Sequence, residues 1–426
     1  IMKVLWFSNS PGNAIERLEG SFVGSSWVSA LDKRIQGKVE LYLAFYYPKR
    51  SDPFRFGETT YHPIGRKNWK LNVLKDIFRT RIIDKQDLNR YLEIINRVNP
   101  DIIHIHGTEN PFGCIIPYTK IPVVVSVQGY VTVIEHKFQN DYTKEELGPG
   151  IHNFGNGLKN FLFQKSFSRI KKNLGKRKEI EQINLRFTKN VLGRTAWDKR
   201  VTSILAPHSR YFHCDEIMRD VFYRTKWRYD LKTVFIIHST LGNKPYKGFE
   251  TLCEALYELR GLPGIQVQWQ VAGIQENDSI VKITRHKLKD RFPKSAIHYL
   301  GNVGPQQLAE VMLHADIFAS TSHIENSPNS LCEAMLLGMP CIATFAGGTS
   351  SLLTDGIEGI LIQDGDPWAL AGAIIELCRN PDLAIKYGRN ARERALIRHE
   401  PDRIVNGLIK CYREILSEST IEHNIN

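Results

Sequence analysis

Short apolar runs alternate with longer segments of helical periodicity along most of the chain. In the first half these runs lie at residues 2–7, 39–45, 101–107 and 122–127. They are rich in Val, Ile and Leu, and they predict the buried strands of a parallel sheet. Residues 20–31 are predicted to form a glycine-bearing loop that enters a helix, and a further helix is predicted over residues 88–98. This alternation predicts βαβ units.

The pattern is interrupted at residues 131–190 by a basic stretch punctuated with Gly and Asn. A strand at residues 190–193 closes the interruption, and a transitional region at residues 212–230 follows. The second half then restarts with predicted strands at residues 233–238, 267–272, 297–300 and 341–344, and one inside residues 314–322. Helices are predicted from residue 249, after residue 280, and over residues 305–314, 368–379, 381–396 and 402–416.

Length and composition favour an α/β protein of two domains. The chain has 426 residues, of which 42% are hydrophobic and 24% charged, enough for two separate cores. We expect an N-terminal domain over residues 1–220, including the basic insertion at about 131–190, and a C-terminal domain over residues 221–402. Residues 403–426 are expected to form a C-terminal helix and tail.

Membrane-spanning and disulfide-rich classes are disfavoured. The sequence contains no run of about 18 apolar residues, and we expect no secretory signal before the first strand. The seven cysteines form no C-x-x-C pair, which argues against a disulfide framework and a zinc site. We therefore expect a cytoplasmic protein.

Two glutamates, Glu325 and Glu333, flank a predicted loop-to-helix junction in the second half. Ser327 is expected to cap this helix, with Pro328 at its first position. The backbone amides of the first turn would face an anion beyond the helix N-terminus, such as the diphosphate of a nucleotide. These amides belong to Asn329, Ser330 and Leu331.

Each glutamate suits a hydroxyl-rich part of the same ligand. Glu333 lies on the second turn, and because helical side chains tilt toward the N-terminus, its carboxylate can accept hydrogen bonds from a ribose. Glu325 lies in the loop ahead. A ligand with an anionic middle and hydroxyls at both ends is a sugar nucleotide. The alternative is a chance pair of glutamates around a capped helix, but the neighbouring strands end here, where open α/β sheets bind ligands.

Other candidate residues lie where strands of either half end. Lys244 and Lys247 follow the strand at residues 233–238 and can meet a phosphate as point charges, although lysines near turns are usually surface residues. Gly24 precedes the first helix and would let a ligand approach the backbone. His106 and Gln128 each end an N-terminal strand and are candidates for the acceptor side.

The sequence Asp364-Gly365-Asp366 resembles a metal-binding D-x-D motif. Asp366 is followed by Pro367 and an apolar helix, however, so helix capping explains it better. We predict no essential metal and no cofactor.

A basic stretch at residues 158–178 contributes strongly to the formal net charge of +12. Its cationic residues are Lys159, Lys165, Arg169, Lys171, Lys172, Lys176, Arg177 and Lys178, and its apolar ones are Phe163, Phe167, Ile170 and Leu174. The apolar residues are spaced like one stripe of a helix, which fits an anionic membrane surface. The alternative is a solvated basic helix whose stripe packs on its own domain. Nucleic acid is not expected, since no nucleic-acid motif accompanies the charge.

Residues 233–400 resemble the nucleotide-binding domain of retaining GT-B glycosyltransferases of family 4 (group 1). The motifs that carry the resemblance are E-x7-E within "PNSLCEAMLLGMPCIAT", the "KG" turn, "GNV", the "GG" loop and "DGIEGILIQDGD". The N-terminal half resembles the acceptor domain more loosely, through its strands, "HIHG" and the glycine loop. "GRTAWDKR" and "YFHCDEIMR" are similar to a bacterial subgroup that builds surface polysaccharides.

The resemblance implies a GT-B fold of two Rossmann-like parallel-sheet domains facing across a cleft, with the C-terminal helix crossing back to the N-terminal domain. It assigns the donor sugar to Glu325, the ribose hydroxyls to Glu333 and the diphosphate to Lys247. The amides of Ser330 and Leu331 face the same diphosphate, and Gly24 lines it from the other domain.

Three positions depart from the family pattern. Thr240 occupies the place of an arginine that usually precedes the "KG" lysine, and Lys244 is the candidate substitute. Gln128 stands where a histidine often ends its strand. Ser351 stands where an acid often follows the glycine pair.

These features predict a glycosyltransferase that moves a hexose-type unit from a UDP- or GDP-type nucleotide sugar to a glycan or lipid-linked acceptor, with retention of anomeric configuration. Glu325 and Lys247 are its predicted catalytic residues. It would act in the cytoplasm, as a peripheral protein at the inner face of the plasma membrane. Two alternatives stay open: a sugar-nucleotide epimerase of GT-B architecture, and a non-catalytic glycan- or partner-binding module.

Overall fold

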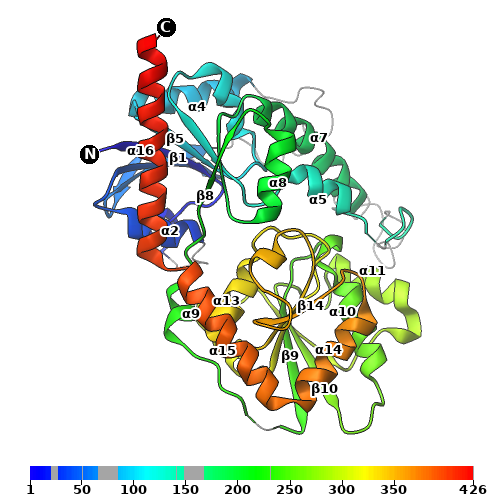
Figure 1. Ribbon diagram of the computed structural model, residues 1–426. Coiled ribbons are helices and arrows are strands. Elements are labelled where there is room, and N and C mark those ends of the chain that lie inside the picture. Colours follow the sequence, from blue (N-terminus) through cyan, green and yellow to red (C-terminus); the bar gives the residue numbers. More distant parts are fainter. Residues whose placement is uncertain are drawn as a thin grey trace. The chain divides into compact units, whose positions relative to one another are not determined.

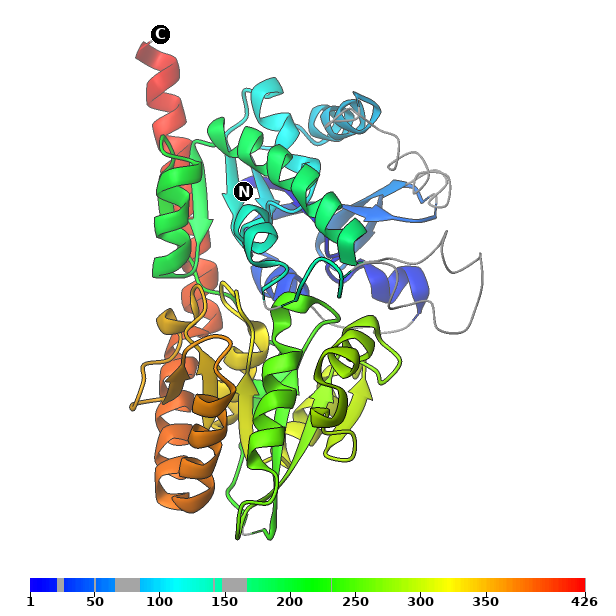
Figure 2. The same cartoon turned by 90° about the vertical axis from the view of Figure 1, so that its right-hand side faces the viewer.

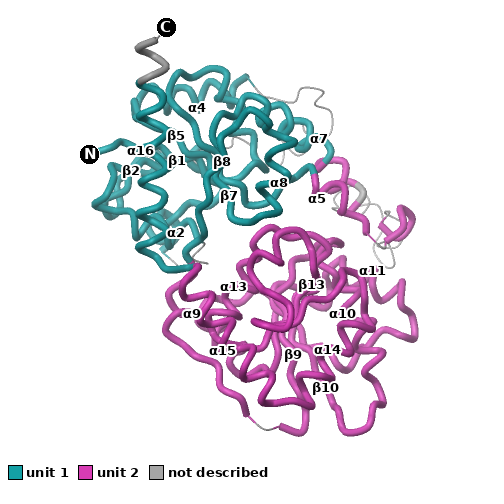
Figure 3. Tube along the Cα trace, viewed as in Figure 1, with its two compact units in different colours: residues 1–132, 175–217, 399–426 teal, residues 133–174, 218–398 magenta. Residues whose placement is uncertain are grey.

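The computed structural model describes residues 1–20, 27–49, 51–65, 85–140, 142–147, 167–230 and 232–425. The chain forms two compact units, teal and magenta in Figure 3. Unit 1 comprises residues 1–132, 175–217 and 399–426, and unit 2 comprises residues 133–174 and 218–398. Residues 133–174, which we expected in the N-terminal domain, thus group with the C-terminal half, and the C-terminal helix groups with unit 1.

Unit 1 contains an eight-stranded sheet in the order β3-β4-β2-β1-β5-β6-β7-β8. Neighbouring strands are parallel except β3 and β4. The strands are β1 (Lys3–Ser8), β2 (Glu40–Tyr47), β3 (Phe54–Phe56), β4 (Thr59–Gly65), β5 (Ile102–His106), β6 (Val123–Ser126), β7 (Asn190–Gly193) and β8 (Arg210–His213). The central strands are continuous apolar runs because both faces of the sheet are covered.

Helices pack on both faces of this sheet. α2 (Trp27–Ile35) and α16 (Pro401–Ile425) cover the face that carries Trp6, while α4 (Lys85–Val98) and the 3-10 helix η1 (Pro111–Tyr118) cover the opposite face. α16, red in Figures 1 and 2, also reaches β8, where Arg210 pairs with Glu414. The other helices are α1 (Ala14–Glu19), α5 (Val131–Lys137), α7 (Phe167–Arg186) and α8 (Ala196–Leu205), of which α5 and α7 cross a boundary between the units.

Unit 2 contains a six-stranded parallel sheet in the order β11-β10-β9-β12-β13-β14. The strands are β9 (Val234–Thr240), β10 (Gln266–Ala272), β11 (Ile297–Gly301), β12 (Ile317–Ser320), β13 (Cys341–Thr344) and β14 (Gly359–Ile362). The chain first winds outward from β9 to β11, then returns to β12 on the other side of β9. The loops that leave β9 and β12 therefore diverge at a topological switch point, where doubly wound sheets bind ligands.

The helices of unit 2 form two layers, one on each face of the sheet (Figure 1). One layer consists of α10 (Phe249–Leu259), α11 (Ser279–Leu288) and α14 (Pro367–Arg379). The other consists of α9 (Asp220–Arg224), α12 (Pro305–Leu313), α13 (Asn329–Leu337) and α15 (Pro381–Arg398). In the described part of unit 2, the short 3-10 helices η3 (Pro245–Lys247), η4 (Lys289–Arg291) and η5 (Thr349–Ser351) lie in connections.

Several details differ from the sequence-based expectations. The expected polar tail is helical to Ile425, because neither proline nor glycine follows Gly407 to stop α16. Ser327 is not the cap of α13: Pro328 is the N-cap, with ψ of 114° and no side-chain capping bond, and the helix begins one residue later at Asn329. A ψ of this size is outside the helical range, so Pro328 cannot be the first helical residue. Strands β3, β4, β8 and β14 were not expected.

Candidate functional site

Two loops of unit 2 meet at the switch point of its sheet. One follows β9 and carries Lys247, and the other follows β12 and carries Glu325. Gly248 makes their close approach possible, because its φ is +70° and a Cβ there would lie 1.8 Å from the carbonyl oxygen of Thr321. The Thr321 hydroxyl donates a hydrogen bond of 3.2 Å to the carbonyl oxygen of Lys247. The "KG" turn is thus a packing requirement of the site.

The structure brings the two predicted catalytic residues together. The Lys247 ammonium forms an ion pair with Glu325, and the Ser322 hydroxyl donates to the same carboxylate oxygen at 2.8 Å. The backbone of Glu325 is also fixed, since its carbonyl oxygen accepts from the Gly348 amide at 2.9 Å. Burial acts to lower the pKa of Lys247, but the Glu325 carboxylate outweighs burial and raises this pKa above its ordinary value. Lys247 is therefore cationic.

Glu333 has a partner that the sequence analysis did not identify. Arg219, near the start of the second segment of unit 2, donates to both oxygens of this carboxylate, from Nε and from Nη2, each at 2.7 Å. The geometry is bidentate, the strong form of an arginine–carboxylate pair. Burial raises the pKa of Glu333 although Arg219 opposes the shift. The segment "YFHCDEIMR" that ends at Arg219 was noted only for a resemblance, and nothing local in it indicates a partner 114 residues away.

The start of α13 agrees only in part with the expected anion site. Asn329 is exposed and Ser330 is half-buried, so both stand at the open end of the helix. Leu331 is buried, and its amide donates to the carbonyl oxygen of Pro328 at 3.0 Å. The expectation that the Leu331 amide faces a ligand is therefore wrong, because a tight first turn already uses it.

Two further predicted residues lie nearby in unit 2. Lys244 is half-buried in the Lys247 loop, and its amide donates to Gly242 at 2.7 Å. Asp366 caps α14 by accepting from the Ala369 amide at 2.8 Å. The interpretation of the D-x-D sequence as a helix cap is confirmed at Asp366.

The N-terminal candidates lie at the carboxyl edge of the unit 1 sheet. Gly24 lies outside the described residues. Gln128 is half-buried in the loop after β6, whereas His106 ends β5 and is 1% exposed. Its ring centroid lies 3.9 Å from that of His104 and 4.6 Å from that of Trp6. Within the described part of the chain, neither ring nitrogen of His106 has a hydrogen-bond partner.

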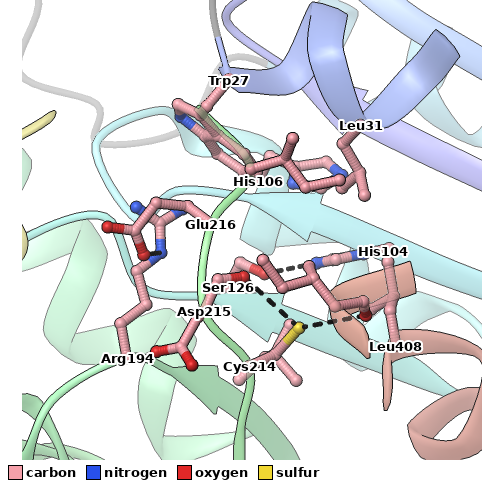
Figure 4. Close-up of a pocket in the computed structure, with 13 residues that line it drawn as sticks. Trp27, Leu31, His104, His106, Ser126, Arg194, Cys214, Asp215, Glu216 and Leu408 are labelled. Carbon is pink, nitrogen blue, oxygen red and sulfur yellow. Dashed lines mark hydrogen bonds and ion pairs between the residues drawn. The ribbon is translucent and has the colours of Figure 1, made fainter. Parts of the chain in front are cut away.

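His106 lines a pocket of unit 1 (Figure 4). Arg194 lies over the ring of Trp27, with its guanidinium carbon 4.4 Å from the ring centroid, and its Nε is 3.6 Å from a Glu216 oxygen. Burial, together with the neighbouring His104 and Arg194, lowers the pKa of His106 well below its ordinary value, so the ring is neutral. A neutral imidazole offers one donor and one acceptor, which matches a hydroxyl group.

The three described apolar residues of the basic stretch belong to unit 2 and pack within it. Phe167 is buried in the core of this unit, and Ile170 and Leu174 pack against the same core. This finding favours the alternative in which the apolar stripe is used within the protein, at least for these three residues. Residues 158–166 of the stretch lie outside the described residues. Across the described part of the chain, every helix is too short or too polar to cross a membrane.

Solved structures are similar to nearly the whole chain. Sucrose-phosphate synthase from Thermosynechococcus elongatus superimposes with a TM-score of 0.69 at 16% identity, covering 98% of this chain and 100% of that chain. HepE from Anabaena, solved in complex with UDP and glucose, superimposes with a TM-score of 0.62 at 15% identity, covering 96% of this chain and 99% of that chain. The protein has the GT-B fold, as the sequence resemblance predicted.

The family comparison concerns the C-terminal half. Residues 232–380 match the family described as "Glycosyl transferases group 1", and this segment contains Lys247, Glu325 and Glu333 but not Arg219. D-inositol 3-phosphate glycosyltransferase from Corynebacterium kroppenstedtii is 36% identical over 99 residues, which span 23% of this chain and 22% of that enzyme. The C-terminal half is thus similar to group 1 glycosyltransferases, and the match spans less than a quarter of this relative's length.

Proposed function

We propose that this protein is a retaining glycosyltransferase of family 4, of the type that builds bacterial surface polysaccharides. It transfers a hexose-type unit from a nucleotide sugar to a glycan or lipid-linked acceptor. The observation that carries the proposal is the Lys247–Glu325 pair at the switch point of unit 2, inside the segment that matches the group 1 family. The fold likeness to HepE, which was solved with UDP, supports a donor of the UDP type, with GDP as the second candidate.

Lys247 and Glu325 form an ion pair with each other in the structure. When the donor binds, each residue would contact a different part of it. The ammonium of Lys247 turns to the diphosphate and stabilises the charge that develops on the leaving oxygen. Glu325 then accepts hydrogen bonds from the sugar hydroxyls. Loss of one such positioned donor typically raises the barrier by about 2.7–4 kcal/mol. The amides of Asn329 and Ser330, with Lys244, add positive potential around the diphosphate.

Glu333 receives the ribose in this proposal, with Arg219 as the group that orients it. A carboxylate has about four lone-pair sites, and the bidentate arginine uses two of them. The remaining two sites suit the two hydroxyls of a ribose. Because Arg219 fixes the carboxylate before the ligand arrives, donor binding costs less side-chain entropy.

The acceptor side falls to unit 1. We assign the neutral ring of His106, with Gln128 beside the next strand end, to the hydroxyl-bearing acceptor, and Gly24 to the donor diphosphate. The charges of the basic stretch would hold a lipid-linked acceptor close by attracting anionic headgroups at the inner face of the plasma membrane. We therefore propose a cytoplasmic, peripheral and metal-independent enzyme.

The test is a panel of UDP- and GDP-sugars, with release of nucleoside diphosphate as the readout and EDTA in a parallel series. We expect slow release from at least one donor, unaffected by EDTA, and loss of release in Glu325→Gln. NMR of the recovered nucleotide distinguishes the alternatives: an altered sugar on an intact nucleotide identifies an epimerase, and binding without any change identifies a non-catalytic module. If no member of the panel binds, the proposal is wrong.

The membrane part is tested separately by flotation with vesicles containing phosphatidylserine. We expect binding at low salt that weakens as salt increases, and a weaker association when Lys172 and Arg177, both exposed on α7, are changed to glutamine. Absence of binding at low salt would remove the membrane claim and leave the transferase claim standing.

A further inference from the structure

A chain of ionisable side chains, buried at its centre, adjoins the two loops that carry Lys247 and Glu325. His323 sits in the loop after β12, two residues before Glu325, and is 1% exposed. Its Nε2 lies 2.6 Å from an oxygen of Glu250, a residue of α10 that is fully buried. On the other side of the ring, Nδ1 lies 3.6 Å from an oxygen of Asp364. One imidazole thus stands between two carboxylates.

The surroundings favour the charged form of this ring. A buried carboxylate without a counter-charge is costly, and Glu250 has no lysine or arginine paired with it among the described residues. The Tyr142 hydroxyl donates to the other Glu250 oxygen at 3.0 Å, but a neutral hydroxyl supplies no counter-charge. An imidazolium donates from Nε2 to Glu250 and balances the buried charge, while Asp364 is close enough to Nδ1 for an ion pair but not for a hydrogen bond.

His323 is also connected to the loops that carry Lys247 and Glu325. The amide of His323 donates to the carbonyl oxygen of Tyr246, next to Lys247, at 2.9 Å. Glu250 belongs to the first turn of α10, which begins directly after the "KG" turn. The His323–Glu250 contact therefore joins the Glu325 loop to the helix that follows the Lys247 loop.

We propose that His323, as an imidazolium held between Glu250 and Asp364, is the positioning residue that sets the Lys247 and Glu325 loops for donor transfer. This inference rests on the proposed function, because it assigns no contact with substrate to His323. It goes beyond the resemblance, which gives no role to His323, Glu250 or Asp364.

The same chain reaches the segment that precedes the basic stretch. Tyr142 contacts Glu250, and Lys137 at the end of α5 lies 3.9 Å from Asp364. Phe138 and Tyr142 are buried in the core of unit 2. Lys137, Phe138 and Tyr142 thus help to support the Lys247 and Glu325 loops, and a change that displaces them would reach Glu325 through His323.

A pH effect follows from the groups around the ring. Among the described residues, the charged or titratable groups that contact the ring or its partners include Glu250 from α10, Asp364 ahead of α14, Lys137 from α5, Tyr142, and Lys287 over the Tyr142 ring. Deprotonation of His323 removes the counter-charge of Glu250, so the support weakens as pH rises. Glu250→Gln removes one of the two carboxylates that favour the proton, and its activity should fall at a lower pH than that of the wild type.

The first experiment does not depend on activity. Ring NMR of histidine-labelled protein, assigned with His323→Gln, should show His323 in the charged form at neutral pH. Hydrogen exchange of the backbone amides at residues 246–248 and 321–326 should be faster in His323→Gln than in the wild type. It should be unchanged in the matched control His298→Gln, whose side chain is exposed on β11. A neutral His323 ring, or unchanged exchange in both loops, would overturn the proposal.

The second experiment uses the donor found with the panel. His323→Gln should lower turnover at saturating donor on the order of ten- to a hundredfold, the scale of a small misplacement of reacting groups, while UDP affinity changes about threefold or less. Tyr142→Phe, which removes a single hydroxyl, should give a smaller loss in the same direction. Equal losses of UDP affinity and turnover in His323→Gln would contradict a positioning role. Failure of the wild type to bind any donor would instead refute the proposed function, and the exchange result would still decide the role of His323.

Discussion

The carboxyl edges of the two sheets differ in how their polar groups are satisfied. In unit 2 each key charge has a protein partner: Lys247 pairs with Glu325, and Arg219 pairs with Glu333. In unit 1, His106 is buried, with an exposed fraction of 1%, but its ring nitrogens have no hydrogen-bond partner within the described residues. A ligand of unit 2 must therefore compete with existing ion pairs, whereas a hydroxyl ligand of unit 1 would satisfy groups that are otherwise unsatisfied.

Removal of Arg219 is the strongest test of the unit 2 side of this comparison. Arg219→Ala leaves Glu333 buried without its counter-charge, and breaking such a pair typically costs about 3–5 kcal/mol. The free energy of unfolding, from urea titration, should fall by this order, and UDP affinity should fall with it. Arg224→Ala, at an exposed arginine of α9, is the matched control and should change neither.

The pH dependence of the Arg219→Ala variant has a defined sign. Burial already raises the pKa of Glu333 above 4.5, and loss of Arg219 removes the contact that opposes this shift. The folded state then binds more protons than the unfolded state, so stability declines as pH rises from about 4.5 toward the raised pKa. A stability of the variant that increased over this range would contradict the assignment.

Lys247 is the next largest case. Lys247→Ala removes the charge that we propose stabilises the leaving group, and it should lower turnover by about 10²–10³. Glu325→Gln should also abolish sugar transfer, because Lys247 loses its ion-pair partner and the sugar hydroxyls lose their proposed hydrogen-bond acceptor. The control is Lys294→Ala, an exposed lysine ahead of β11. Turnover within about threefold of the wild type in Lys247→Ala would mean that the pair is structural only.

Gly248 tests whether the two loops must approach as closely as the structure shows. Gly248→Ala places a Cβ 1.8 Å from the Thr321 carbonyl oxygen at a φ of +70°. Strain and overpacking should lower the free energy of unfolding by about 2–3 kcal/mol. Gly242→Ala, in the same loop with no heavy atom within 4 Å of the added Cβ, should be close to neutral. Equal effects of the two changes would show that the loops are not in contact.

The histidine pair of unit 1 gives the smallest and most discriminating effects. His104 contacts the Tyr412 hydroxyl at 2.6 Å and also the Ser126 hydroxyl, so His104→Phe leaves buried groups unsatisfied and should cost about 1–3 kcal/mol. His106→Phe removes a ring without such partners and should change stability by less than about 0.5 kcal/mol while it lowers acceptor-dependent turnover. Thermal melts of the two variants, measured together, reveal whether the contrast holds.

Acid titration examines the same pair. Burial, with Arg194, lowers the pKa of His104 to about 3, so the folded state binds fewer protons than the unfolded state below the ordinary value of 6.5. The stability that the neutral ring contributes is present above pH 6.5 and is lost as pH falls toward 3. His104→Phe should therefore weaken the acid dependence of unfolding. If His104→Phe leaves the acid dependence of unfolding unchanged, a group other than His104 is responsible for it.

The alternation of strands and helices and the E-x7-E junction beyond the strand ends could be predicted from the sequence because each has a local pattern. Strand β4 was missed because its sequence, with two threonines, a histidine and Pro63, contains no apolar run. The proline is tolerated because the pairing of β3 with β4 ends at Tyr61, before Pro63. Arg219 and His323 were missed for another reason. Their partners are far away in sequence or on another element, and no local rule indicates which buried carboxylate a given cation will meet.

The contacts of the Leu331 amide and of the basic stretch could not be predicted either, because they also depend on tertiary structure. The helix start was predicted correctly to within a residue, but its first-turn hydrogen bonds depend on the geometry of Pro328. The apolar stripe of α7 was visible in the sequence, whereas the surface that covers Phe167 is formed by the distant core of unit 2.

The most direct test of the central claim is a crystal structure of the protein with UDP and a donor sugar bound. The account predicts a diphosphate oxygen within hydrogen-bond distance of the Lys247 ammonium, the sugar at Glu325 and the ribose at Glu333. A nucleotide bound elsewhere, with Lys247 still paired to Glu325, would contradict it.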